Sequence, residues 1–182
     1  MTAALPSTLV LGGARSGKSA FAERLVVASG LVRTYCATAE AQDAEMRERI
    51  ARHRADRADG GWSTVEQPLD LAAVIGSQTG PGRALLIDCL TLWLSNVMLR
   101  GDDVAARQDD LLAALAAAAG PVVLVSNELG LGLVPETPLG RRFRDAQGRL
   151  NQAVAAACPR VVFVAAGLPL ALKQPSEGHS IS

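Results

Sequence analysis

Short runs of apolar residues alternate with longer stretches of helix-forming residues along most of this chain. The apolar runs are continuous, as in 85–87 (LLI), 122–125 (VVLV) and 161–164 (VVFV). Continuous apolar runs are typical of strands that are buried on both faces, as in a parallel sheet covered by helices. The alternation therefore predicts an α/β protein with a mostly parallel sheet and helices on both faces.

This pattern also predicts where the elements lie. Strands are expected at 8–11, 33–37, 63–66, 84–87, 122–126 and 161–165. Helices are expected at 18–29, 43–58, 69–75, 90–99, 104–119 and 140–157. A chain of 182 residues suits a single core, so residues 1–173 are expected to form one domain. The polar stretch 174–182 is expected to be a flexible C-terminal tail.

The most informative motif joins the first predicted strand to the first predicted helix. Residues 12–19 (GGARSGKS), called the phosphate loop below, match the pattern G-x-x-x-x-G-K-[ST]. Glycines let successive backbone N–H groups turn onto phosphate oxygens, and the helix N-terminus adds partial positive charge. Lys18 is expected to reach the β- and γ-phosphates, and the Ser19 hydroxyl is expected to bind Mg²⁺. The alternative, a chance match in a glycine-rich turn, is disfavoured by the flanking strand and helix.

Other polar residues follow predicted strands at the carboxyl edge of the sheet, where ligands bind in folds of this kind. Asp88 follows the strand 84–87 directly and is the expected second Mg²⁺ ligand. An acid in this place can also serve as the N-cap of the next helix. Thr38 and Glu66 end two other strands, and the segment 126–128 leaves a further strand at the same edge.

The predicted helix 43–58 contains a histidine of uncertain role. Met46, Ile50 and His53 share one helical face, and the other faces carry arginines and glutamates. Nearby cations lower an imidazole pKa and keep the ring neutral and nucleophilic. Two interpretations stay open: a histidine packed in the core, and a catalytic histidine beside arginines that bind polyphosphate.

A long loop with several glycines and prolines follows the strand 122–126. Loops of this length at the ligand edge often form lids or substrate walls. The next helix carries four arginines, at Arg141, Arg142, Arg144 and Arg149. These arginines either form a solvated face, bind phosphate or contact a neighbouring subunit.

Composition narrows the classes of function. The formal net charge is +0, which disfavours nucleic acid as the main partner. The cysteines Cys36, Cys89 and Cys158 have neither disulfide nor zinc spacing, which favours small core residues in a reducing cytoplasm. No apolar run reaches the ~20 residues of a membrane span, and no signal peptide is evident.

Together these features resemble the bifunctional adenosylcobinamide kinase / adenosylcobinamide-phosphate guanylyltransferase family of cobalamin biosynthesis. The resemblance covers about residues 9–173. It rests on the phosphate loop, the turn 37–39 (ATA), 45–46 (EM), 49–50 (RI), 53–54 (HR), Trp62, 65–66 (VE), 86–91 (LIDCLT), 126–136 (SNELGLGLVPE) and 141–152 (RRFRDAQGRLNQ). The last two segments are the most specific in combination.

The resemblance implies a single-domain P-loop NTPase fold of the RecA-like type and two reactions. The aminopropanol hydroxyl of adenosylcobinamide is phosphorylated with ATP or GTP, and GMP from GTP is then transferred to that phosphate through a guanylyl-histidine. The implied catalytic residues are His53 and Lys18, with Ser19 and Asp88 binding Mg²⁺. The implied nucleotide contacts are Gly12, Gly13, Ala14, Arg15, Ser16, Gly17, Lys18, Ser19, Ala37, Thr38, Ala39, Arg54, Ala55, Asp56, Arg57, Glu66 and Asp88. The resemblance also implies a propeller-shaped homotrimer.

Two other functions stay compatible with the same motifs. One is a small-molecule kinase without nucleotidyl transfer, in which His53 is structural. The other is a non-enzymatic module that switches with bound nucleotide. Covalent labelling by GTP distinguishes the first from the bifunctional enzyme, and turnover of corrinoids distinguishes the second.

Overall fold

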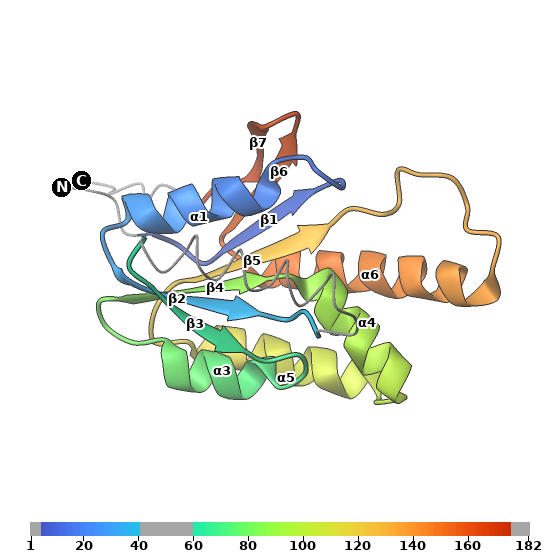
Figure 1. Cartoon of the computed structure of the whole chain (residues 1–182), viewed down its shortest axis with the longest axis horizontal. Helices are drawn as coiled ribbons and strands as arrows, with labels where there is room; N and C mark the ends of the chain where they lie inside the picture. Colours follow the sequence, from blue (N-terminus) through green and yellow to red (C-terminus); the bar gives the residue numbers. More distant parts are fainter. Residues whose placement is uncertain (1–4, 41–59, 176–182) are drawn as a thin grey trace, which may run out of the picture.

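A sheet with strand order β3-β2-β4-β5-β1-β6-β7 forms the centre of the molecule (Figure 1). The computed structural model describes residues 5–40 and 60–175. The strands are β1 (Thr8–Gly12), β2 (Val32–Ala37), β3 (Trp62–Glu66), β4 (Arg83–Asp88), β5 (Val122–Asn127), β6 (Arg160–Ala165) and β7 (Leu168–Lys173). All neighbouring pairs are parallel except β6 and β7. The predicted α/β class and mostly parallel sheet are confirmed.

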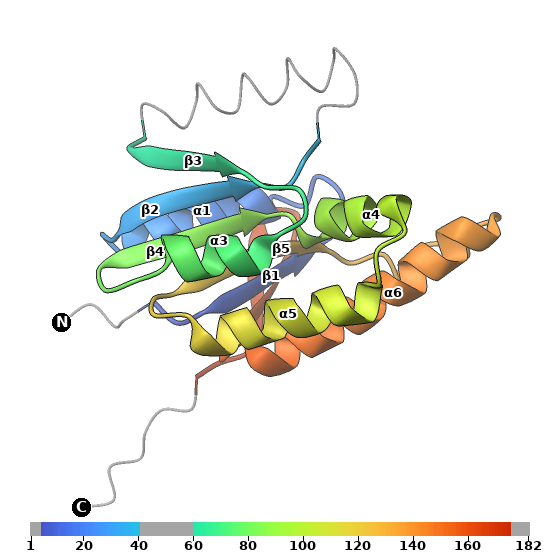
Figure 2. The same cartoon turned by 90° about the horizontal axis from the view of Figure 1, so that it is seen from below.

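Helices cover both faces of this sheet (Figures 1 and 2). They are α1 (Lys18–Ala28), α3 (Leu71–Gln78), α4 (Leu90–Arg100), α5 (Val104–Ala117) and α6 (Pro138–Ala157). One face packs against α1 through a cluster that includes Val10, Ala22 and Val26. The other face packs against α3 to α6 through a larger cluster that includes Leu9, Trp93 and Leu150. The strands between these layers are buried on both sides, which explains their unbroken apolar sequence.

Each predicted strand is present, with its ends shifted by no more than one residue. The largest changes at helix starts have a local cause. The helix predicted from residue 69 begins at Leu71, because the Asp70 side chain accepts a hydrogen bond from Ala73 N as the N-cap. The helix predicted from 140 begins at Pro138, because Thr137 caps it and proline suits the first helical turn. The predicted helix 43–58 lies outside the described residues, and the flexible tail at 174–182 stays a prediction.

The strand β7 was not predicted from the sequence. It is joined to β6 by a tight turn in which Ala166 and Gly167 both have positive φ, 50° and 78°. A two-residue turn with positive φ at both positions matches the right-handed twist of the two strands that it joins. All six residues of β7 are exposed, and Pro169 sits within it, as edge strands allow. An exposed strand lacks the buried apolar run by which the other strands were recognised.

Among the described residues, no helix is long and apolar enough to cross a membrane.

Candidate nucleotide-binding site

The phosphate loop connects the end of β1 to the N-terminus of α1. Gly17 is the N-cap of α1 and has φ of 92°, in the left-handed region that glycine adopts without strain. Arg15 also has positive φ, 55°, and Ser16 N donates to Gly13 O at 3.3 Å. The chain thus curls around the helix N-terminus, where free N–H groups and the helix dipole form an anion-binding cradle.

Close packing disfavours a side chain at two glycines of the loop, and at Gly17 the positive φ disfavours one as well. A Cβ on Gly12 would lie 2.5 Å from the carbonyl oxygen of Val164 and 2.5 Å from Ser16 Oγ. A Cβ on Gly17 would lie 3.2 Å from Gly167 Cα. Val164 belongs to β6 and Gly167 to the turn that follows it, so this hairpin packs against one side of the phosphate loop.

The lysine of the motif lies across this cradle. Lys18 Nζ donates to Gly13 O at 3.1 Å, which folds the side chain back over the loop. Its charge also reaches the end of β4. Burial, and after it the charge of Asp88, raise the pKa of Cys89 to about 11, although the charge of Lys18 acts to lower it.

Asp88 ends β4 at the same edge of the sheet. The register pairs Asp88 with Val125 of β5 and Gly12 of β1 with Asn127 of β5, so one strand separates the acid from the phosphate loop. Asp88 Oδ2 accepts a hydrogen bond from the Tyr35 hydroxyl at 3.0 Å. The N-cap of α4 is Cys89, without a side-chain capping bond. The alternative interpretation of Asp88 as this N-cap is therefore wrong.

The oxygens of Ser19 and Asp88 fit Mg²⁺. This ion is typically held by one or two side-chain oxygens together with substrate phosphates and water. In the described part of the chain, no group of three or more His, Cys, Asp or Glu side chains could hold a metal by itself. A hydroxyl and a single carboxylate suit an ion that enters with the nucleotide better than a permanently bound one.

Thr38 lies at the carboxyl edge of the sheet, as expected, but its side chain forms hydrogen bonds to the protein backbone. Its hydroxyl donates to Cys89 O and accepts from Cys89 N, both at 2.8 Å. Its backbone N–H donates to Asp88 O at 3.2 Å. Thr38 is fully buried and joins the end of β2 to the start of α4. This role explains a threonine here without any ligand.

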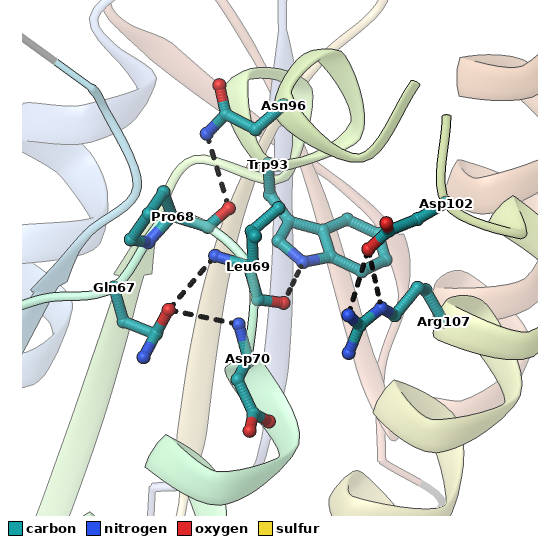
Figure 3. Close-up of polar contacts among 8 residues, drawn as sticks. All are labelled: Gln67, Pro68, Leu69, Asp70, Trp93, Asn96, Asp102 and Arg107. Atoms are coloured by element: carbon teal, nitrogen blue, oxygen red, sulfur yellow. Dashed lines mark hydrogen bonds and ion pairs between the residues drawn. The ribbon is translucent and has the colours of Figure 1, made fainter. Parts of the chain in front are cut away.

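Asn96 extends the same support to the end of β3. Its Nδ2 donates to Thr38 O at 2.8 Å and to Pro68 O at 3.2 Å. Trp93 Nε1 donates to Leu69 O at 2.7 Å, so α4 holds the connection after β3 at two points (Figure 3). Glu66 ends β3 in register with Ala37 and is exposed at this edge.

A second polar network joins the end of β5 to α6 and to the phosphate loop. The sequence analysis did not predict this network. The Ser126 hydroxyl and Gln147 Nε2 donate to Asn151 Oδ1 at 2.7 and 3.0 Å. Asn151 Nδ2 donates to Asn127 O at 3.0 Å, and Glu128 N donates to Gly12 O at 3.1 Å. The spacing of Gln147 and Asn151 on an otherwise apolar helical face was the available signal.

The loop 128–137 leaves this network and extends beyond the sheet (Figure 1). Its apolar side chains are exposed, with Leu131 at 82% and Leu133 at 96%. Arg141 Nη1 donates to the carbonyl oxygens of Pro135 and Glu136 at 2.9 and 2.7 Å. Arg141 therefore closes the base of the loop, a role that none of the open interpretations of the arginines included.

The structure thus brings together the phosphate loop, residues 37–39, Glu66 and Asp88 at one edge of the sheet. The remaining predicted site residues, His53, Arg54, Ala55, Asp56 and Arg57, lie outside the described residues.

Solved structures of a recombinase and of an ATPase have a similar architecture. The RadB recombinase superposes with a TM-score of 0.51 at 16% identity, covering 87% of this chain and 73% of that one. An ATPase of a bacterial type III secretion system superposes with a TM-score of 0.54 at 12% identity, covering 91% of this chain and 56% of that one. At these identities the likeness shows the fold, which is the predicted RecA-like P-loop NTPase fold.

Sequence comparison is more specific. The family model described as cobinamide kinase / cobinamide phosphate guanyltransferase matches residues 8–172. The bifunctional adenosylcobalamin biosynthesis protein CobP of Pseudomonas aeruginosa is 53% identical, over 91% of this chain and 96% of its own length. The protein CobU of Escherichia coli K12, which carries the same description, is 39% identical over 91% of this chain and 98% of its own length. This chain is therefore an enzyme of the cobinamide kinase / cobinamide phosphate guanyltransferase family.

Proposed function

We propose that this chain performs both reactions of its family. It phosphorylates the aminopropanol hydroxyl of adenosylcobinamide with ATP or GTP. It then transfers GMP from GTP to that phosphate, which gives adenosylcobinamide-GDP and pyrophosphate. The observation that carries the proposal is the family match over residues 8–172 in a chain whose phosphate loop and Asp88 meet at one edge of the sheet.

For the kinase reaction, the phosphate loop binds the nucleotide and neutralises its charge. Backbone N–H groups at the start of α1 hold the phosphates, and Lys18 leaves Gly13 O to contact the β- and γ-phosphates. Ser19 and Asp88 would hold Mg²⁺, which would supply further positive charge for the transfer. Phosphoryl transfer requires mainly positioning and electrostatic stabilisation, and these residues supply both.

For the guanylyl transfer, we propose His53 as the nucleophile. Its neutral imidazole attacks the α-phosphate of GTP, a P–N bond forms, and the P–O bond to pyrophosphate breaks. The phosphate of the corrinoid then attacks the same phosphorus, and the P–N bond breaks to free the histidine. Dividing the transfer in two lets a neutral nucleophile displace pyrophosphate first, so that the corrinoid phosphate attacks a reactive phosphoramidate instead of GTP.

The remaining nucleotide contacts are proposed at Ala37, Thr38, Ala39, Arg54, Ala55, Asp56, Arg57 and Glu66. Because the Thr38 hydroxyl is bonded to Cys89 on both its donor and acceptor sides, we expect the turn 37–39 to act through its shape and backbone. We further propose a cytoplasmic homotrimer, which sedimentation velocity can test through the mass of the particle in solution.

The decisive test offers the purified protein adenosylcobinamide with ATP alone or with GTP and follows the corrinoid products by mass spectrometry. ATP alone should give the phosphate, and GTP should give the GDP-linked product together with pyrophosphate. Formation of the phosphate alone with both nucleotides would instead identify a simple kinase. Tight GTP binding without any corrinoid turnover would identify a nucleotide switch.

A further inference from the structure

Tyr35 occupies a distinctive position beneath the ligand edge. It lies in the middle of β2, on the face of the sheet that α1 covers, and is 6% exposed. Its aromatic ring packs within an apolar cluster that includes Val10 and Val123. Its hydroxyl leaves this cluster and donates to Asp88 Oδ2 at 3.0 Å, the carboxylate that ends the neighbouring strand. A phenol thus connects the core of the sheet to the acid of the nucleotide site.

The ring of Tyr35 is itself held in place from the next strand. Trp62 of β3 contacts it edge to face, with ring centroids 6.0 Å apart and planes at 85°. The Arg33 guanidinium lies 5.8 Å from the Trp62 ring centroid, and Arg33 Nε donates to Gly60 O at 3.0 Å. Such aromatic and cation–π contacts restrict the ring plane. The direction of the Tyr35 hydroxyl is therefore fixed by β2 and β3 together.

We propose that Tyr35 is a positioning residue for the Asp88 carboxylate, and hence for binding of the metal–nucleotide complex. The inference rests on the proposed role of Asp88 as a metal ligand. A carboxylate whose Oδ2 is held by the phenol presents Oδ1 in one orientation, whereas an unrestrained carboxylate rotates. Groups that orient a metal ligand typically contribute about 10- to 100-fold to metal affinity. A phenol orients the acid without adding a positive charge that would compete with the cation.

A purely structural role is the alternative. In that case the hydroxyl only satisfies a buried polar group, and its loss lowers stability without affecting metal binding. Thr8 provides a matched control at the opposite end of the sheet. It is fully buried at the start of β1, and its hydroxyl donates to Pro6 O at 2.7 Å. Thr8→Val and Tyr35→Phe each remove one hydroxyl, with the hydrogen bond it donates, while keeping most of the side-chain volume.

The experiment measures Mn²⁺ affinity by electron paramagnetic resonance of the free ion. The full chain is first saturated with a non-hydrolysable GTP analogue. Wild type is compared with Tyr35→Phe, Thr8→Val and Asp88→Asn, and the melting temperature of each is recorded. Binding of the analogue in EDTA serves as a metal-free reference.

We expect Tyr35→Phe to weaken Mn²⁺ binding about tenfold and Asp88→Asn to weaken it more. Thr8→Val should bind the ion as wild type does, while its melting temperature falls about as much as that of Tyr35→Phe. Analogue binding in EDTA should be unchanged in Tyr35→Phe. Wild-type Mn²⁺ affinity in Tyr35→Phe beside weak binding in Asp88→Asn would overturn the role of Tyr35 alone. Wild-type affinity in Asp88→Asn would overturn the metal role of Asp88, and the inference with it.

Discussion

Gly167 N donates a hydrogen bond to Ser16 O at 2.8 Å, which ties the turn between β6 and β7 to the phosphate loop. The two glycines that face each other here, Gly17 and Gly167, both have positive φ, and a Cβ on Gly17 would lie only 3.2 Å from Gly167 Cα. The phosphate loop is thus held by contacts with a hairpin that lies far from it in the sequence. The turn that precedes β7 therefore supports the shape of the phosphate loop together with the loop's own glycines.

Substitutions in this turn should change the melting temperature, one lowering it and the other raising it. Gly167→Ala places a side chain in open space at φ of 78°, so we expect only backbone strain, roughly 1 kcal/mol. For a chain of this size that lowers the melting temperature by about 2–4 °C. Ala166→Asn should raise it, because asparagine tolerates the φ of 50° better than alanine does. Calorimetry of both variants tests the turn geometry, and the opposite order of stabilities would contradict it.

If one nucleotide site serves both reactions, Lys18→Ala should slow both about 10²–10³-fold, because the variant loses transition-state charge stabilisation. The chain has one other lysine, Lys173, which serves as the control. Lys173 Nζ donates to the carbonyl oxygens of Ala155 and Ala156 at the end of α6, away from the phosphate loop. Lys173→Ala should keep both activities. Wild-type kinase turnover in Lys18→Ala would contradict the assignment of the site.

Arg141→Ala should loosen the loop 128–137, because it removes both hydrogen bonds to the loop base. Arg142 is exposed on the next position of the same helix and has no such bond among the described contacts, so Arg142→Ala is the matched control. Thermolysin should cut near Leu131 and Leu133 faster in Arg141→Ala than in wild type or the control. Equal cleavage rates in all three proteins would show that another contact holds the loop.

The buried thiols predict how stability depends on pH. Burial raises the pKa of Cys36 to about 12, against a lowering hydrogen bond from the Gln67 backbone, and burial raises that of Cys158 to about 11. Between pH 9 and these pKa values, the unfolded chain releases thiol protons that the folded chain keeps. The contribution of these thiols to the free energy of unfolding is therefore fully present below pH 9 and falls above it. The slope approaches about 1.4 kcal/mol per pH unit for each thiol. Urea titrations at rising pH should show this decline, and the Cys36→Ala/Cys158→Ala variant should show a smaller one.

Much of the fold could be predicted because its signals are local. The runs that became β4, β5 and β6 are buried on both faces and therefore apolar without a break. The strand β7 could not be predicted because its residues are exposed and show no buried apolar run. Its pairing with β6 is what makes it a strand. A hairpin turn of Ala166 and Gly167 is a weaker signal than the Asn-Gly or Asp-Gly pairs that usually mark such turns.

Some residues of the candidate site likewise had a local signal in the sequence, and others had none. Lys18 could be placed at the start of α1 from a motif and Asp88 at the end of β4 from a predicted strand, while their roles in binding stay predictions. The roles of Thr38 and Arg141 could not, because they depend on which backbone groups of distant segments lie within reach. Tyr35 had no signal at all in the sequence, since an aromatic residue in a strand is ordinarily core. Its hydrogen bond to Asp88 follows from the parallel pairing of β2 and β4.

The most direct test of the central claim is covalent labelling of His53→Ala with [α-³²P]GTP. Wild type should take up an acid-labile, alkali-stable label, as a phosphoramidate does. The variant should take up none and should lose guanylyl transfer. It should still phosphorylate adenosylcobinamide, because the γ-phosphoryl group passes directly to a hydroxyl. A well-folded His53→Ala protein that still takes up GMP label would contradict the claim and place the nucleophile elsewhere.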